Sequence, residues 1–255
     1  MSTNSKIKLH SSRRTVLLVF VLSAFVLLLL GALVVFQVFK GSNENSSSEE
    51  DITYPVLEGT IYIKNEVELR NVIDNSVGKS VVIAFTKDIQ LTESALSITN
   101  NTNITLTIDS KYGVCKIFGV AGNSTIVVED GGVLTLNGVI VTHERISIGG
   151  AGVVVNSGGT VNMHSGEISG NVVDNSGGGI HNRGTFRLYG GKISDNTATN
   201  NGGGVYNVGD FEMYGGEITK NNANMGGGVY NRGTFNRLGG VIADNKATSR
   251  GYNWA

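Results

Sequence analysis

The sequence predicts an all-β fold, a parallel β-helix built from stacked copies of one short unit. The first observation behind this prediction is a phrase at Gly178–Asn182 that returns at Gly203–Asn207 and at Gly227–Asn231. Self-similarity at a fixed period is typical of solenoid proteins, whose copies stack on one another. The second observation is that apolar and polar residues alternate within each copy, as in Phe186–Leu188. This is the period of a strand with one buried face and not that of a helix.

Two series of asparagines measure the repeat. The copies are 24 to 27 residues long over residues 132–255, and each reads as three short strands separated by corners rich in Gly and Asn, which tolerate left-handed backbone. Asparagines stacked in this way can hydrogen-bond along a column, as in cross-β ladders. The expected ladders are Asn156, Asn182, Asn207 and Asn231, and Asn171, Asn196, Asn221 and Asn245.

The repeated phrases also carry a resemblance to a known family. The Gly-Gly-Gly-Val-Tyr-Asn phrase at 202–207 and the Tyr-Gly-Gly-Glu-Ile phrase at 214–218 resemble the repeats of right-handed, pectate-lyase-like β-helices in prokaryotic adhesin-like surface proteins. The resemblance covers roughly residues 130–250 and implies a right-handed helix in a cell-surface setting. Together with the strand-like runs that begin near Ile83, it predicts about seven turns.

The N-terminal segment predicts a membrane anchor. Val16–Phe39 contains no charged residue, and a helix of this length spans ~36 Å, enough for a bilayer core of ~30 Å. Basic residues precede it, so the positive-inside rule predicts a cytoplasmic tail at 1–15, a membrane span at 16–39 and an extracellular remainder. The alternative is a cleaved signal peptide, although such peptides usually have a shorter apolar core of about 7–15 residues.

The residues between this anchor and the repeats predict a linker and a cap. Residues 40–58 are rich in Ser, Asn and Glu, which is typical of a flexible polar linker. Residues 59–131 contain the first strands and a short helix with Asn65 as N-cap and Glu68 reaching back to it. We expect this helix to cover the open end of the stack. Its expected apolar face is Leu69, Val72, Ile73 and Val77.

Charges on the expected outer face form columns of alternating sign. Arg187 occupies the same place as Glu212 in the next copy, and two further columns are Glu167, Lys192 and Glu217, and Asp195, Lys220 and Asp244. Opposite charges on neighbouring strands help to set the register, by a few tenths of a kcal/mol each. Of the 20 basic residues, five lie at or before Lys40, whereas all 21 acidic residues follow it, so the expected exported part carries 15 − 21 = −6. This balance argues against a nucleic-acid partner.

The sequence contains no recognisable catalytic, metal-binding or cofactor-binding constellation. Cys115 stands alone in an apolar strand and is predicted to be buried, while His164 and His181 replace tyrosines in two columns. The candidate ligand-binding residues are the tyrosines of those columns, because stacked aromatics suit contact with sugars or apolar partners. The alternative is that they only fill the corners. These tyrosines are Tyr189, Tyr206, Tyr214 and Tyr230.

These observations predict a function in adhesion or in the cell envelope. The expected protein is anchored in the membrane and binds glycans or surface proteins through a lateral face of its extracellular β-helix. One alternative is a carbohydrate-active enzyme of the pectate-lyase-like fold, and another is an inert, self-assembling spacer. Residues 250–255 echo the opening of another copy, so we expect the last turn to be covered by another chain, by Trp254 or by further repeats of a longer protein.

Overall fold

The computed structural model of this protein describes residues 59–99, 101–143 and 149–249. The predicted tail at 1–15, membrane span at 16–39 and linker at 40–58 lie outside the described residues, as does the segment at 250–255. Among the helices that are described, none combines the length and the apolar character needed to cross a bilayer.

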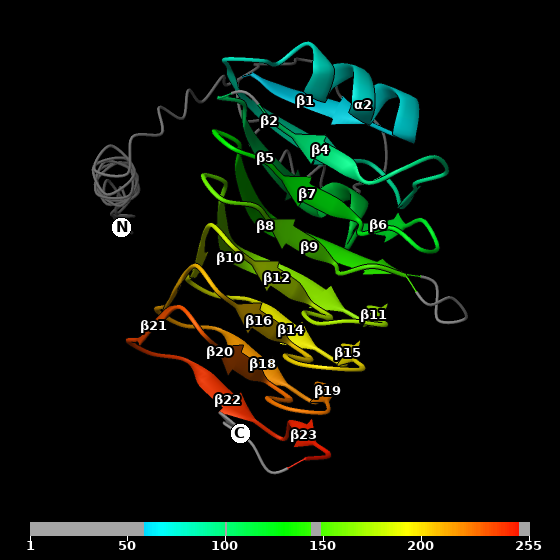
Figure 1. The fold of residues 1–255 in the computed structure, drawn as a ribbon. Helices are drawn as coiled ribbons and strands as arrows, with labels where there is room; N and C mark the ends of the chain where they lie inside the picture. The colour runs from blue at the N-terminus through cyan, green and yellow to red at the C-terminus, as the bar shows by residue number, and fades with distance from the viewer. Residues whose placement is uncertain (1–58, 100, 144–148, 250–255) are drawn as a thin grey trace, which may run out of the picture. The chain divides into compact units, whose positions relative to one another are not determined.

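Short strands stack in parallel to form a β-solenoid of about seven turns, which confirms the predicted parallel β-helix. Figure 1 shows the turns following one another from the cyan helix α2 to the red strand β23. The largest sheet contains 13 strands. Its main path is β1 (Thr60–Ile63), β2 (Ser80–Phe85), β5 (Asn103–Ile108), β8 (Val133–His143), β10 (Thr160–Ser169), β13 (Thr185–Leu188), β17 (Asp210–Met213) and β21 (Thr234–Arg237), joined by β3 (Ile89–Gln90), β6 (Lys116–Gly119), β14 (Lys192–Ser194), β18 (Glu217–Thr219) and β22 (Val241–Ala243).

Two smaller sheets complete the solenoid. One has six strands and the other four. The six-stranded sheet contains β4 (Leu96–Ile98), β7 (Ile126–Val128), β9 (Val153–Val155), β12 (Ile180–Asn182), β16 (Val205–Asn207) and β20 (Val229–Asn231). The four-stranded sheet contains β11 (Val172–Val173), β15 (Thr197–Ala198), β19 (Asn222–Ala223) and β23 (Lys246–Ala247).

The four-stranded sheet corrects the prediction of three strands in each copy. The last copies each contain a fourth strand, such as β15, which follows the closing asparagine. These strands have only two residues, so they are too short to show the alternation by which a strand is recognised in a sequence. They are detected only through their backbone pairing with the neighbouring turns.

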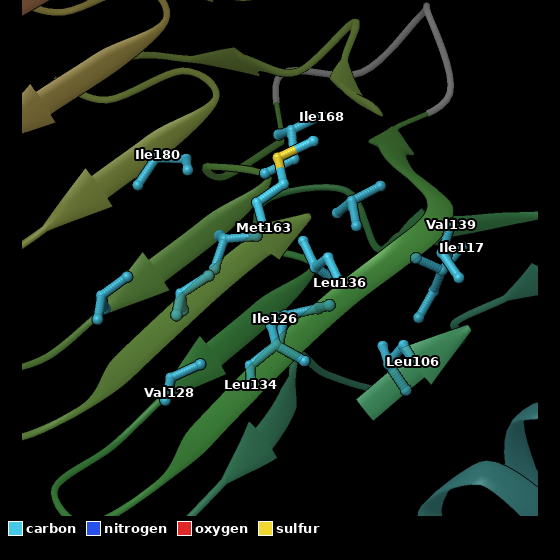
Figure 2. Close-up of a cluster of buried hydrophobic side chains, with 14 of the residues drawn as sticks. Leu106, Ile117, Ile126, Val128, Leu134, Leu136, Val139, Met163, Ile168 and Ile180 are labelled. Atoms are coloured by element: carbon cyan, nitrogen blue, oxygen red, sulfur yellow. The ribbon is translucent and has the colours of Figure 1, made fainter. Parts of the chain in front are cut away.

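Equivalent apolar residues lie directly over one another in the interior. Phe186 pairs with Phe211, which pairs in turn with Phe235, and their ring centroids are 4.9 and 4.6 Å apart. Earlier turns contribute aliphatic side chains to the same core, such as Leu134, Leu136 and Met163 in Figure 2. Burial of this apolar surface along the whole stack is the main source of its stability.

The helix α2 (Glu66–Asp74) lies at the β1 end of the stack, and a 3-10 turn, Ser110–Tyr112, lies between β5 and β6. As predicted, Asn65 is the N-cap, because its Oδ1 accepts a hydrogen bond of 2.8 Å from the Glu68 N–H. Leu69 and Ile73 are buried in the core. The predicted face was wrong at Val77, which lies beyond the helix and is 52% exposed.

The corners before the closing asparagines use left-handed backbone at an unexpected position. Asp195, Lys220 and Asp244 have φ angles of 55°, 58° and 58°, and Gly170 occupies the same place with a φ of 68°. Among the described residues, the ladder asparagines do not adopt this conformation. The expected column of alternating charge is therefore a column of strained corner residues, since a side chain in this region costs about 1–2 kcal/mol.

Candidate functional site

The column of closing asparagines forms a buried hydrogen-bonded ladder, which confirms the predicted asparagine stacking. Nδ2 of Asn171 donates to Oδ1 of Asn196 at 2.8 Å. The same bond links Asn196 to Asn221 and Asn221 to Asn245, at 3.0 Å in both cases. The backbone N–H of each of the first three asparagines donates to the same Oδ1 atom as its side chain does, at 3.1, 3.0 and 3.0 Å. These backbone donors determine which atom of each amide is the oxygen.

The second ladder contains three of the four predicted asparagines. Nδ2 of Asn182 donates to Oδ1 of Asn207, which donates in turn to Asn231, each at 2.6 Å. Asn156 was wrongly included, because the residue opposite Asn182 is Val155. The interval from Asn156 to Asn182 is one residue longer than the next interval, so Asn156 falls one position past the column. Its Nδ2 instead donates to Oε2 of Glu129 at 2.8 Å.

A buried histidine, missed by the sequence analysis, extends the first ladder. Nδ1 of His143 lies 2.8 Å from Oδ1 of Asn171, and its Nε2 lies 2.8 Å from the carbonyl oxygen of Asn123. The side chain is 2% exposed. It is the last inward-facing residue of β8, after Val139 and Val141. This alternation is the signal that could have placed it inside.

The tyrosines predicted to bind ligands lie in two columns. Tyr189 and Tyr214 are 41% and 42% exposed, and their rings stack at 4.9 Å with an interplanar angle of 7°. His164 stacks on Tyr189 at 4.6 Å and 6°. Because each of these rings faces its neighbour, the column presents ring edges and hydroxyl groups to the outside. It does not offer the faces of its inner rings on which a sugar could stack.

The other tyrosine column is less exposed. Tyr206 and Tyr230 are half-buried and stack at 5.7 Å, while His181 contacts Tyr206 edge-on at 4.9 Å. Burial, followed by the charge of Arg183, lowers the pKa of His181 from 6.5 to about 4. The ring is therefore neutral at physiological pH. This arrangement is that of side chains packed at a corner.

Charged residues flank the exposed tyrosines. Arg187 Nε donates to Glu212 Oε2 at 2.8 Å, and the Tyr214 hydroxyl donates to the same oxygen at 3.4 Å. Partial burial and this carboxylate raise the pKa of Tyr214 above its usual value of 10.0, which keeps the hydroxyl protonated. The patch therefore offers hydrogen-bond donors and acceptors at its surface.

The predicted column of Glu167, Lys192 and Glu217 is in register, because Lys192 pairs with both glutamates across the strands. Within the part of the chain that the structure describes, however, Lys192 forms no ion pair with them. Oε1 of Glu167 accepts instead from the Ser194 hydroxyl at 2.6 Å. These charges are solvated neighbours and contribute little to stability.

Residues that could support other chemistry are dispersed. Cys115 is a free, buried thiol, and burial, together with the charge of Asp88, raises its pKa. A thiol that stays protonated is a poor nucleophile. Among the described residues, no three His, Cys, Asp or Glu side chains are grouped so that they could hold a metal ion.

The structure thus establishes a parallel β-solenoid with stacked asparagines. Its right-handed winding and its pectate-lyase-like, adhesin-like type stay predictions. Comparisons of the chain with protein-family models, with curated proteins and with solved structures each find no match.

Proposed function

We propose that this chain is a membrane-anchored surface protein of the adhesin-like type, whose right-handed β-solenoid is a rigid extracellular scaffold. In this proposal, residues 1–15 lie in the cytoplasm, residues 16–39 span the membrane and residues 40–58 connect the span to the solenoid. The lateral face around Tyr189 and Tyr214 binds a glycan or a surface protein.

One observation carries the binding part of the proposal. The exposed column of His164, Tyr189 and Tyr214 lies beside the Arg187–Glu212 ion pair, so apolar ring edges and polar groups share one outward patch. Aromatic residues and arginine are enriched where proteins contact partners. The neighbouring strands are fixed by parallel pairing on both sides, so this patch is rigid and loses little conformational entropy on binding.

The stacking also determines how a partner would make contact. Since the inner ring faces are covered, binding would use the ring edges and the phenolic hydroxyls. Removal of the hydroxyls should therefore weaken binding, although phenylalanine preserves the stacking of the rings. A lost hydrogen bond between uncharged groups is worth about 0.5–1.5 kcal/mol.

The test of binding uses the purified full chain in detergent with a panel of polysaccharides and surface proteins. We expect saturable binding without turnover. The variant Tyr189→Phe with Tyr214→Phe should bind about tenfold more weakly, whereas the control Tyr206→Phe with Tyr230→Phe should bind like the wild type. Equal loss in both variants would contradict the assignment of the patch. Turnover of a polysaccharide would support the alternative of an enzyme, and end-to-end oligomers without binding would support a spacer.

The test of the anchor is the location of an epitope added after Ala255 in intact cells. The proposal predicts that the chain stays in the membrane fraction and that an antibody outside the cells reaches the epitope. The control Arg13→Glu with Arg14→Glu should disturb this orientation, because basic residues before the span hold it. Release of the chain into the medium would contradict the anchor and favour a cleaved signal peptide.

A further inference from the structure

Both ring nitrogens of His143 face hydrogen-bond acceptors. Nδ1 lies 2.8 Å from Oδ1 of Asn171, and Nε2 lies 2.8 Å from the main-chain oxygen of Asn123. The carbonyl oxygen can only accept. The ring can therefore donate at both positions only if it carries two protons, which is the imidazolium form.

The asparagine ladder shows that Asn171 also presents an acceptor. Oδ1 of Asn196 receives the backbone N–H of Asn171 at 3.1 Å, so this atom is the oxygen of its amide. The Asn171 atom that lies 2.8 Å from it must then be the donor Nδ2. The remaining side-chain atom of Asn171, which contacts the ring of His143, is consequently the oxygen.

The interior is shaped around the ring of His143. A Cβ atom added to Gly119 would lie 2.3 Å from Nε2 of His143, and one added to Gly149 would lie 2.5 Å from its Cδ2. Glycine at these positions lets the backbone approach the ring. The hydroxyl of Thr125 is 3.5 Å from Nδ1, which is too long to compete with the contact to Asn171.

We propose that His143 is an imidazolium in the folded protein and acts as a pH-sensitive lock at the end of the asparagine ladder. When protonated, it joins the ladder to the preceding turn through Asn123. When neutral, it presents a lone pair to one of the two oxygens and loses that link. The proposal depends only on the fold and is independent of the proposed function.

The sign of the effect follows from these contacts. The folded state holds the proton through two hydrogen bonds at 2.8 Å, and hydrogen bonds to a charged group are the stronger kind. Burial of the charge opposes this, but both oxygens are fixed by the surrounding backbone and ladder. The folded state therefore binds this proton more tightly than the unfolded chain does, and the lock strengthens stability in acid and is lost as the pH rises.

Charged groups on the surrounding elements do not explain the protonation. Lys116 on β6 and Glu167 on β10 pair in register with Ile140, three residues before His143. Asp174, beyond β11, is exposed. Of the charged residues that the structure describes on these elements, none forms a hydrogen bond or an ion pair with the ring.

The direct test is the protonation of the ring in the full chain in detergent, measured by nitrogen NMR of the histidine side chains at pH 7.5. A histidine in water is then about nine-tenths neutral. We expect two N–H signals from the ring of His143, identified by their absence in the variant His143→Gln. A single N–H at this pH would overturn the proposal.

A second test compares stability at pH 5.5 and pH 8.5 in the wild type and two variants that do not titrate. In His143→Asn, Nδ2 replaces the donor to Asn171, and in His143→Gln, Nε2 replaces the donor to Asn123. We expect the unfolding equilibrium constant of the wild type to rise about tenfold more than that of either variant, which corresponds to one unit of proton linkage. The same pH profile in all three proteins would also overturn the proposal.

Discussion

The replacement Asn196→Leu tests the buried ladder at its centre. Asn196 is 0% exposed, and its side chain makes four hydrogen bonds. Its Nδ2 donates to the Ile168 carbonyl at 2.8 Å and to Asn221 Oδ1 at 3.0 Å. Its Oδ1 accepts from the backbone N–H and the Nδ2 of Asn171, at 3.1 and 2.8 Å. Leucine has a similar volume and removes all four.

The loss of stability can be estimated from the groups left without partners. The backbone N–H of Asn171 is orphaned in the interior, and so is one hydrogen of its Nδ2. An unsatisfied buried group costs about 1–3 kcal/mol, which gives a total of about 2–6 kcal/mol. The apolar surface that leucine buries offsets about 1–2 kcal/mol of this. We therefore expect the free energy of unfolding to fall by about 3 kcal/mol.

The assay is equilibrium unfolding in guanidinium chloride, with Asn200→Leu as the matched control. Asn200 is exposed, and its side chain makes one long hydrogen bond of 3.5 Å, to Asn175. Water can replace that contact, so the control should change stability by less than about 0.5 kcal/mol. An equal effect of the two replacements would refute the argument that the inner ladder holds the turns together.

Three further replacements test other features of the solenoid. Lys220→Gly should raise the unfolding midpoint, by about 0.5 kcal/mol, because glycine relieves the strain at a φ of 58°; a lower midpoint would contradict that strain. Gly204→Ala should lower stability by about 2 kcal/mol, because the new Cβ would lie 2.6 Å from the Gly228 carbonyl; an unchanged midpoint would show that the turns can separate. His181→Tyr should remove a loss of stability in acid, measured by unfolding at pH 4.5 and pH 7. Its lowered pKa of about 4 means that the unfolded chain binds more protons between pH 4 and pH 6.5, so stability falls, by about 2 kcal/mol after allowance for partial exposure, as the pH falls through that window. The variant should lack this slope because tyrosine, as at Tyr206, does not titrate there, and an unchanged slope would assign the effect to other groups.

The features that the sequence predicted are those that recur at equal intervals. Phe186 and Phe211 occur 25 residues apart, and the alternation around them indicates which face is buried. Equal intervals make equivalent residues neighbours, so the core column and the ladder from Asn171 to Asn245 could be predicted together. The N-cap Asn65 could be predicted because capping depends only on residues within one turn of the helix.

The features that it missed depend on three-dimensional detail. Asn156 was placed in a ladder because the copy that contains it is one residue longer than the next, and only the pairing of β9 with β12 shows which residue shifts. His143 joins the ladder from the longer strand β8, outside the repeat pattern. The rings of Tyr189 and Tyr214 were correctly aligned, but their coverage of each other's faces depends on side-chain torsions that a pattern does not contain.

Disulfide trapping tests the register of neighbouring turns most directly. Thr185 pairs with Asp210 across β13 and β17, so their Cα atoms lie about 4.8 Å apart, within the range that a disulfide spans. In a Cys115→Ala background, Thr185→Cys with Asp210→Cys should oxidise readily to a disulfide. The offset pair, Thr185→Cys with Glu212→Cys, is separated by about 8 Å and should not. Efficient closure of the offset pair, with none in the aligned pair, would contradict the stacking on which the whole account depends.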